Sequence, residues 1–175
     1  AVRKTFIPTV FLTDRYASAV EYAAAIHGAQ TRKGRDTAYL SHLIGVSSLV
    51  IEAGGDETQA IAGLLHDAVE DCGGMPRYYD IQARFGAEVA EIVRDCSDST
   101  DEDWKNSVPY RERKQLYLDH LDVVGRRSLV VAIADKVHNA RAIVTDIVML
   151  GPAKAFGRFT GKPADVAWYY EGCLR

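Results

Sequence analysis

A short segment of the sequence combines an imidazole with several carboxylates. Six residues that follow the pair Leu64-Leu65 include a histidine and three acids, namely His66, Asp67, Glu70 and Asp71. At about 100° per residue, these side chains would share one arc of about 140° on a helix and face one site. The leucines draw the segment inward, so the charges beside them need a partner, and a metal ion is a common one for this donor pair. The alternative is a solvated, acidic helix end.

Two further residues would complete a set of metal ligands. His42 lies at the start of an apolar segment, where an isolated histidine is otherwise a core residue. Asp135 follows the apolar run 129–134, and a carboxylate there is costly unless it is coordinated or paired, for instance with Arg127 or Arg141. Two imidazoles and two carboxylates suit Mn²⁺, Fe²⁺, Co²⁺ or Zn²⁺. We therefore predict a divalent-metal site formed by His42, His66, Asp67 and Asp135.

A basic cluster shortly precedes His42. Arg32, Lys33 and Arg35 lie in the segment between the first two expected helices. We expect these cations to bind a pyrophosphate group, and the alternative is an ordinary exposed loop. The whole sequence has 24 acidic and 21 basic residues, a net charge of −3, which offers no general attraction for nucleic acid. A polyanionic ligand would need such a local cluster.

Helical periodicity dominates the elements that must position these residues. Apolar side chains at three- and four-residue steps predict helices over 13–29, 40–54, 57–71, 76–85, 87–96, 110–124 and 128–146, with a last short helix through 168–170. Thr13 or Asp14 and then Asp56 are the expected N-caps, and the acidic stretch 97–103 is expected to be a surface loop. We predict one all-α domain over 1–175, with a core at about 13–150 and a helical tail at 151–175.

The composition fits a globular domain. Apolar residues make up 47% of the 175 residues and charged residues 26%, which suffices to bury a core. The longest apolar run has six residues, far short of the roughly 20 that span a bilayer, and the N-terminal residues do not resemble a signal peptide. The three cysteines lack Cys-x-x-Cys spacing. We expect a cytoplasmic protein that binds neither membranes nor nucleic acid. The segment Trp168-Tyr169-Tyr170 is a candidate homo-oligomer surface if it does not pack on the core.

The candidate ligands resemble the H…HD…D signature of the HD-domain phosphohydrolases. With Glu70 and Asp71, the segment reads HDxxED, which is similar to the hydrolase domain of the RelA/SpoT family that degrades the alarmone (p)ppGpp. Other segments resemble that family's motifs as well: 25–33 its AxxHxGQxRK, 37–42 its PYxxH, 134–141 its ADRLHNMR, and Arg113-Lys114 its ERK segment. The resemblance covers residues 16 to 147.

This resemblance implies an all-α HD-domain helical bundle and a metal-dependent reaction. The implied activity is removal of the 3′-pyrophosphate from (p)ppGpp, giving GDP or GTP and pyrophosphate, with (p)ppApp as a close alternative substrate. Mn²⁺ is the expected cofactor, other divalent transition metals being alternatives. Glu70 and Asp71, which are not needed as ligands, would hold the attacking water and move its proton. Tyr39 and Asn139 are expected to contact the nucleotide, and the short chain suggests a hydrolase that works without a synthetase domain.

Two other functions stay open. One is a different HD-family activity, an NADPH 2′-phosphatase or a nucleotidase, and the other is an alarmone-binding module without catalysis. The sequence also departs from the family pattern, since Ala38 and Leu43 replace prolines and Ala142 replaces a threonine that can contact substrate. These departures remove no expected metal ligand, but they leave the preference between guanine and adenine open.

Overall fold

The computed structural model describes residues 11–97, 104 and 107–175. Within these ranges the regular elements are helices, and the β structure is an isolated bridge between Thr31 and Ala38. The prediction of an all-α fold is confirmed.

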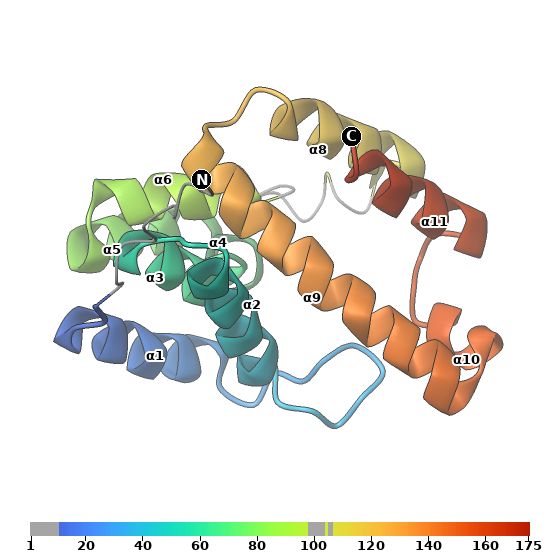
Figure 1. Ribbon diagram of the computed structural model, residues 1–175, viewed down its shortest axis with the longest axis horizontal. Helices are drawn as coiled ribbons and strands as arrows, with labels where there is room; N and C mark the ends of the chain where they lie inside the picture. The colour runs from blue at the N-terminus through green and yellow to red at the C-terminus, as the bar shows by residue number, and fades with distance from the viewer. Residues whose placement is uncertain (1–10, 98–103, 105–106) are drawn as a thin grey trace, which may run out of the picture.

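The long helix α9 (Arg126–Leu150) crosses the molecule, with one group of helices on each side of it (Figure 1). One group contains α1 (Asp14–His27), α2 (Leu40–Glu52), α3 (Glu57–Leu65), α4 (Ala68–Asp71), α5 (Gly74–Phe85) and α6 (Ala87–Cys96). The other contains α8 (Tyr110–Leu121), α10 (Pro152–Phe156) and α11 (Pro163–Gly172). The loop between α1 and α2 reaches across the lower side of the molecule toward the end of α9.

The hydrophobic core lies between α2, α3, α6 and α9. Leu43, Val46, Leu64, Val93 and Val131 have no exposed surface. Helix α3 is buried along its whole length after its first turn. Because α3 is packed on all sides, its C-terminal end lies in the interior. The residues that directly follow it, His66 and Asp67, are therefore placed near the centre of the molecule.

The helix predicted over 57–71 is interrupted at His66-Asp67, which corrects that prediction. Helix α3 ends before His66, and α4 begins after Asp67, the N-cap residue of α4. The His66 Nδ1 atom lies 2.8 Å from the carbonyl oxygen of Gly63, so the ring bonds an acceptor that a continuing helix would use for its own backbone. The single helical arc expected for the four side chains is therefore wrong. Asp67, Glu70 and Asp71 nevertheless line the same cavity.

Most helix ends follow the sequence signals. The Thr13 side chain accepts from the backbone N–H of Arg15, and Asp56 forms a capping box with Gln59. Helix α9 extends one turn past its predicted end and stops at Gly151, whose φ of 82° favours glycine. Of the predicted acidic loop, residues 98–103 lie outside the described part of the chain.

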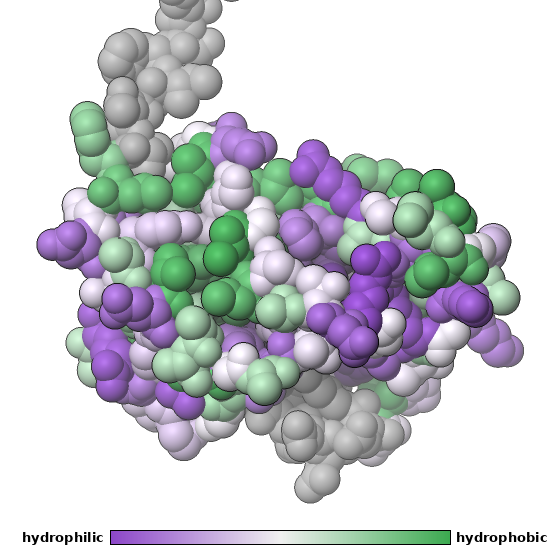
Figure 2. Space-filling model, turned by 90° about the horizontal axis from the view of Figure 1, so that it is seen from below, coloured by the Kyte–Doolittle hydropathy of each residue, from purple (hydrophilic) through white to green (hydrophobic). Residues whose placement is uncertain are grey.

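The lower face combines hydrophilic and hydrophobic residues. Hydrophilic residues gather over the loop between α1 and α2, beside hydrophobic residues where α9 meets α10 (Figure 2). In the described ranges, no helix is both long enough and apolar enough to cross a bilayer. The aromatic segment considered for oligomer formation is not an exposed patch, because Tyr169 is buried and Tyr170 lines the main cavity.

Candidate metal centre and active site

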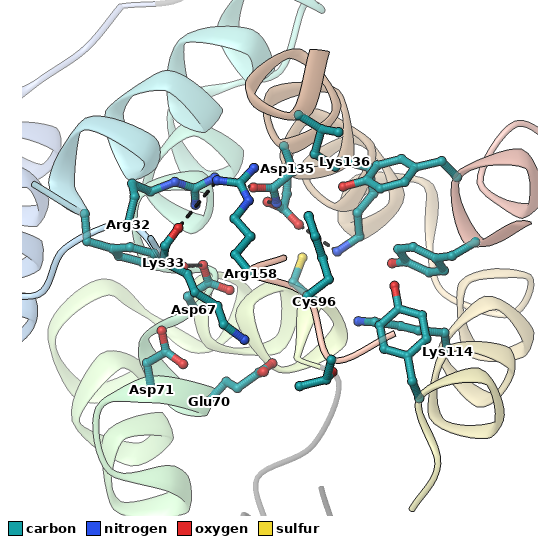
Figure 3. A pocket seen from close by; sticks show the side chains of 18 of the residues that line it. Arg32, Lys33, Asp67, Glu70, Asp71, Cys96, Lys114, Asp135, Lys136 and Arg158 are labelled. Atoms are coloured by element: carbon teal, nitrogen blue, oxygen red, sulfur yellow. Dashed lines mark hydrogen bonds and ion pairs between the residues drawn. The ribbon is translucent and has the colours of Figure 1, made fainter. Parts of the chain in front are cut away.

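A cavity of about 410 Å³ lies where the two groups of helices meet α9. Carboxylates line one wall, with Asp67, Glu70 and Asp71 in view, and Lys114 lies on the opposite wall (Figure 3). The loop after α1 contributes Arg32 and Lys33 to the same cavity. The candidate acids and two of the three candidate cations of the basic cluster therefore face a shared space.

The structure brings the four candidate metal ligands together: Asp67 and Asp135 line this cavity, and His42 and His66 are buried next to them and do not line it. The donor atoms of His42, His66 and Asp67 all lie within 4.8 Å of one another. The Asp135 Oδ1 atom is 3.2 Å from His42 Nε2 and 3.5 Å from His66 Nε2. These residues come from α2, the break between α3 and α4, and α9. Asp135 therefore pairs with the two histidines and with Lys136. It does not form the structural salt bridge with Arg127 or Arg141 that was the alternative to a metal site.

The ring nitrogens of both histidines fit a divalent metal. Their Nε2 atoms are buried and face the two carboxylates, with Asp135 Oδ1 3.2 Å from His42 Nε2 and Asp67 Oδ2 2.9 Å from His66 Nε2, so one cation could contact all four groups. The other nitrogen of each ring is occupied: His66 Nδ1 bonds the Gly63 carbonyl, and His42 Nδ1 lies 2.9 Å from His138 Nδ1. A hydrogen bond at Nδ1 leaves the Nε2 lone pair available to a metal ion. Two neutral imidazoles, two carboxylates and a divalent cation sum to zero charge.

The electrostatics of the cluster concentrate on His66 and its two acids. Burial alone would lower the pKa of His66, but Asp67 and Asp135 outweigh it and raise this pKa well above its usual value. Burial of Asp135 would raise its pKa. Its cationic neighbours Lys136 and His66 outweigh this effect and hold the pKa of Asp135 well below its usual range. In the absence of metal, a proton on His66 therefore compensates part of the negative charge.

Metal affinity is expected to rise with pH because of this proton. A metal ion and a proton compete for the same imidazole, so below the raised pKa of His66 the affinity should increase about tenfold per pH unit, with about one proton released per ion. Titrations with Mn²⁺ in buffers of different ionisation enthalpy measure both quantities. An affinity that is constant from about pH 5.5 to 7.5 would contradict this assignment of His66.

His138 supports His42 from behind and occupies a gap opposite Gly45. Burial, together with the nearby charge of His42, lowers the pKa of His138 to about 4, so its ring is neutral near pH 7 and can accept the His42 proton. A Cβ atom on Gly45 would lie 2.3 Å from His138 Nε2. The missing side chain at position 45 thus provides the space in which the supporting ring lies.

We expect Gly45→Ala to weaken metal binding without unfolding the chain. Alanine favours the helix at this position, but its methyl group must displace the His138 ring and break the bond to His42. Loss of such an outer hydrogen bond lowers metal affinity by roughly 10- to 100-fold. Gly125→Ala is the matched control, since no atom lies within 4 Å of a Cβ there and φ is −64°. Equal affinities of the two variants would show that His138 does not orient His42.

The two candidate catalytic acids lie on α4 at the cavity wall. Gln30 Nε2 donates to Asp71 Oδ2 at 2.9 Å, and Gln30 Oε1 lies 2.8 Å from His27 Nδ1. Because the amide oxygen faces the His27 ring, the amide N–H₂ must face the acid. Glu70 lines the cavity next to Asp71. Neither acid belongs to the group of possible metal donors among the described residues.

Tyr39 and Asn139 lie between the metal ligands and the basic loop. The Tyr39 hydroxyl donates to Asp67 Oδ2, and Asn139 Nδ2 donates to Asp135 Oδ1 at 2.5 Å. Arg32 lies against both, since its Nη2 donates to Asn139 Oδ1 at 2.6 Å and its guanidinium lies 5.6 Å from the Tyr39 ring centre. Both candidate nucleotide-contacting residues therefore touch a candidate metal ligand directly.

Arg35 does not line the cavity, in contrast to the expectation that it faces the substrate with Arg32 and Lys33. Its guanidinium pairs with Asp146, a buried residue of α9. A sequence pattern places the three cations in one loop, but the loop turns between Lys33 and Arg35, where Gly34 has a φ of 75°.

Several cavity residues were not predicted as site residues. Lys114 and Tyr110 come from α8, Lys136 from α9, and Arg158 from the segment between α10 and α11. Lys114 lies in the ERK-like segment, and Lys136 lies in the segment 134–141 that resembles ADRLHNMR. Arg158 lies in a glycine-containing tail without a motif, and its position depends on how that tail folds back onto α9.

The chain is similar to proteins of known type. A family model described as HD domain matches residues 19–148. The guanosine-3′,5′-bis(diphosphate) 3′-pyrophosphohydrolase MESH1 of Xenopus tropicalis is 33% identical over 126 residues, which are 70% of this chain and 66% of that protein. Its counterpart from Drosophila melanogaster is 33% identical over 130 residues, 73% and 68% of the two chains. The matched region thus spans about two thirds of each relative.

Solved structures show the same likeness. The structure of a metazoan SpoT orthologue, described as hydrolysing ppGpp and acting in starvation responses, has a TM-score of 0.68 at 26% identity, covering 95% of this chain and 97% of that one. A structure from Listeria monocytogenes has a TM-score of 0.62 at 27% identity and covers 77% of each chain.

Proposed function

The chain belongs to the HD-domain family, and on that premise we propose that it is a metal-dependent hydrolase of guanosine alarmones. It removes the 3′-pyrophosphate of (p)ppGpp and gives GDP or GTP and pyrophosphate. The observation that carries the proposal is a cavity lined by Asp67, Asp135, two further carboxylates and a basic loop, with the buried rings of His42 and His66 within 3.7 Å of those two aspartates. The activity named for the metazoan relatives supports the choice of substrate.

The proposed metal ligands are His42, His66, Asp67 and Asp135, and the proposed metal is Mn²⁺. A divalent ion bound there supplies Lewis-acid activation of water and of a phosphoryl oxygen. Because this ligand set neutralises the ion, the centre by itself does not repel a phosphate group. The buried Nε2 atoms of the two histidines, which lie 2.9 to 3.7 Å from oxygens of Asp67 and Asp135, support this ligand assignment.

Glu70 and Asp71 are the proposed acid–base pair. They hold the water that attacks the phosphorus bonded to the 3′-oxygen, and they accept its proton. The bond between phosphorus and the 3′-oxygen breaks, the 3′-oxygen takes up a proton, and pyrophosphate leaves with the oxygen of the water. The hydrogen bond from Gln30 holds the Asp71 carboxylate in the orientation in which it accepts.

Cations from two distant segments that meet at the cavity are the proposed partners of the phosphates. Arg32 and Lys33 approach from the loop after α1, and Arg158 approaches from the tail. Asn139 and Tyr39, which lie beside the metal ligands, are the proposed contacts to the ribose region. Since these residues recognise phosphate and ribose and not a base, (p)ppApp is a second proposed substrate.

Product analysis tests the proposal. Purified protein with Mn²⁺ is expected to release pyrophosphate from ppGpp, and a chelator is expected to abolish the release. ppApp, NADPH and a simple nucleoside monophosphate complete the panel. Turnover of another nucleotide without turnover of ppGpp or ppApp refutes the proposal. Orthophosphate as the product would instead indicate a phosphatase.

A further inference from the structure

Asp146 is a buried carboxylate that pairs with two arginines from distant segments. It is 1% exposed, and its Oδ2 atom lies 2.7 Å from Arg158 Nη2. Its Oδ1 atom pairs with Arg35. Arg35 belongs to the loop between α1 and α2, and Arg158 to the segment between α10 and α11. One side chain of α9 therefore joins two segments that are otherwise separated by more than a hundred residues.

The loop that carries Arg35 is fixed at both ends of its turn. At its base, the bridge between Thr31 and Ala38 is supported by the bonds from Arg32 N to Thr37 O and from Tyr39 N to Gln30 O, both 2.8 Å. At its tip, the contact of Arg35 with Asp146 is the ion pair that attaches the loop to α9. Arg32 belongs to the base, and its side chain also donates to Asn139 on α9; Lys33 lies between the base and the tip, and both residues line the cavity.

Arg158 touches both the cavity and the loop. It lines the cavity, its Nη1 lies 3.5 Å from the backbone oxygen of Lys33, and its Cβ would be 3.6 Å from a Cβ on Gly34. A single carboxylate shared by two guanidinium groups leaves one positive charge uncompensated, so Asp146 positions the cations without cancelling them.

We propose that Asp146 and Arg35 are positioning residues that hold the cations Arg32, Lys33 and Arg158 at the phosphate-binding end of the cavity. Arg35 thus acts through Asp146 and does not itself contact the pyrophosphate. This inference rests on the proposed function for the identity of the ligand, but the attachment of the loop is a property of the protein alone.

A double-mutant cycle with Arg35→Gln and Asp146→Asn tests the proposal. We expect Arg35→Gln to weaken the binding of inorganic pyrophosphate and to raise KM for ppGpp, each by about tenfold, while kcat and Mn²⁺ affinity stay unchanged. In the Asp146→Asn background, Arg35→Gln should have no further effect. An arginine that touches the ligand directly would instead give additive losses, which would overturn the proposal.

Limited proteolysis gives a readout that is independent of catalysis. Trypsin should cleave after Arg32 and Lys33 faster in both single variants than in the wild type, because cleavage requires the loop to leave its folded position. Unchanged cleavage together with unchanged pyrophosphate affinity in Arg35→Gln would refute the tether, that is, the attachment of the loop to α9 through Arg35 and Asp146. Arg35→Gln remains informative if Asp146→Asn fails to fold, since the Arg35 side chain is one-third exposed.

The chain offers matched controls away from the cavity. Asp80 on α5 also lies between two arginines, with Arg84 Nε at 2.8 Å and Arg77 Nη1 at 3.4 Å. Asp80→Asn and Arg127→Gln should leave loop cleavage and pyrophosphate affinity at wild-type values. If the wild type fails to hydrolyse ppGpp, the proposed function fails, while pyrophosphate binding and loop cleavage still decide whether the tether exists.

Discussion

Replacing Asp135 by alanine is expected to abolish both metal binding and pyrophosphate release. Its Oδ1 atom lies closer to His42 Nε2 than Asp67 does, 3.2 Å against 3.7 Å, and it receives the Asn139 amide as well. Without this carboxylate the ligand set loses one negative charge and its only donor from α9. Turnover should fall by at least about 1,000-fold, because the step depends on activated water. Metal content by elemental analysis and pyrophosphate release from ppGpp measure the two effects.

Asp135→Asn separates loss of the ligand from loss of the fold. The amide has the same size and still contacts Asn139, but it carries no charge to attract a cation. Both variants should keep the helical circular dichroism spectrum. The alanine variant is expected to melt earlier, because the ion pair of Asp135 with Lys136, at 2.6 Å, and its hydrogen bond from Asn139 are lost. A fully active Asp135→Ala protein would disprove the metal assignment.

Glu70→Gln is expected to keep the metal and lose the reaction. Glutamine fills the same space on α4, but it cannot accept the proton of the attacking water. General-base catalysis contributes typically 100- to 10,000-fold, so kcat should fall within that range while KM changes little. The Mn²⁺ stoichiometry, measured by electron paramagnetic resonance, should stay at the wild-type value.

Glu91→Gln is the matched control for this variant. Glu91 is an exposed acid of α6, and it does not line the cavity. Its replacement should therefore leave both kcat and metal content unchanged. If Glu70→Gln turns over at the wild-type rate, Asp71 alone would have to accept the proton, and the role proposed for Glu70 is wrong.

The sequence predicted the candidate metal ligands, which form the inner end of the site, better than the arginines and Asp146, which form its outer end. His42, His66, Asp67 and Asp135 interrupt apolar segments, and because burying such groups is costly, their position in a pattern is informative. The four do converge, as the spacing suggested. The break between α3 and α4 was missed because Leu64-Leu65-His66-Asp67-Ala68 is compatible with a continuous helix. The contact that accompanies the break, from the His66 ring to the Gly63 carbonyl, depends on tertiary packing.

The outer end could not be predicted, since it depends on contacts between distant segments. Arg35 has the same charge as Arg32 and lies in the same loop, and only the position of Asp146 in the fold distinguishes their roles. Similarly, the sequence places Asp146 at the polar end of a helix. In the structure α9 continues to Leu150, and Arg158 from the C-terminal tail pairs with Asp146. Arg158 has no motif at all. These residues meet through tertiary structure and leave no local pattern.

Helix α9 also fixes the distance between Asp135 and Asp146. Asp135 at the metal end and Asp146 at the phosphate end are eleven residues apart, which is about 16 Å along the axis and close to three full turns, so both point to the same side. A single inserted residue between them would turn one end by about 100° relative to the other. The distance from the candidate metal ligand Asp135 to the carboxylate that pairs with Arg35 and Arg158 is therefore set by the register of one helix.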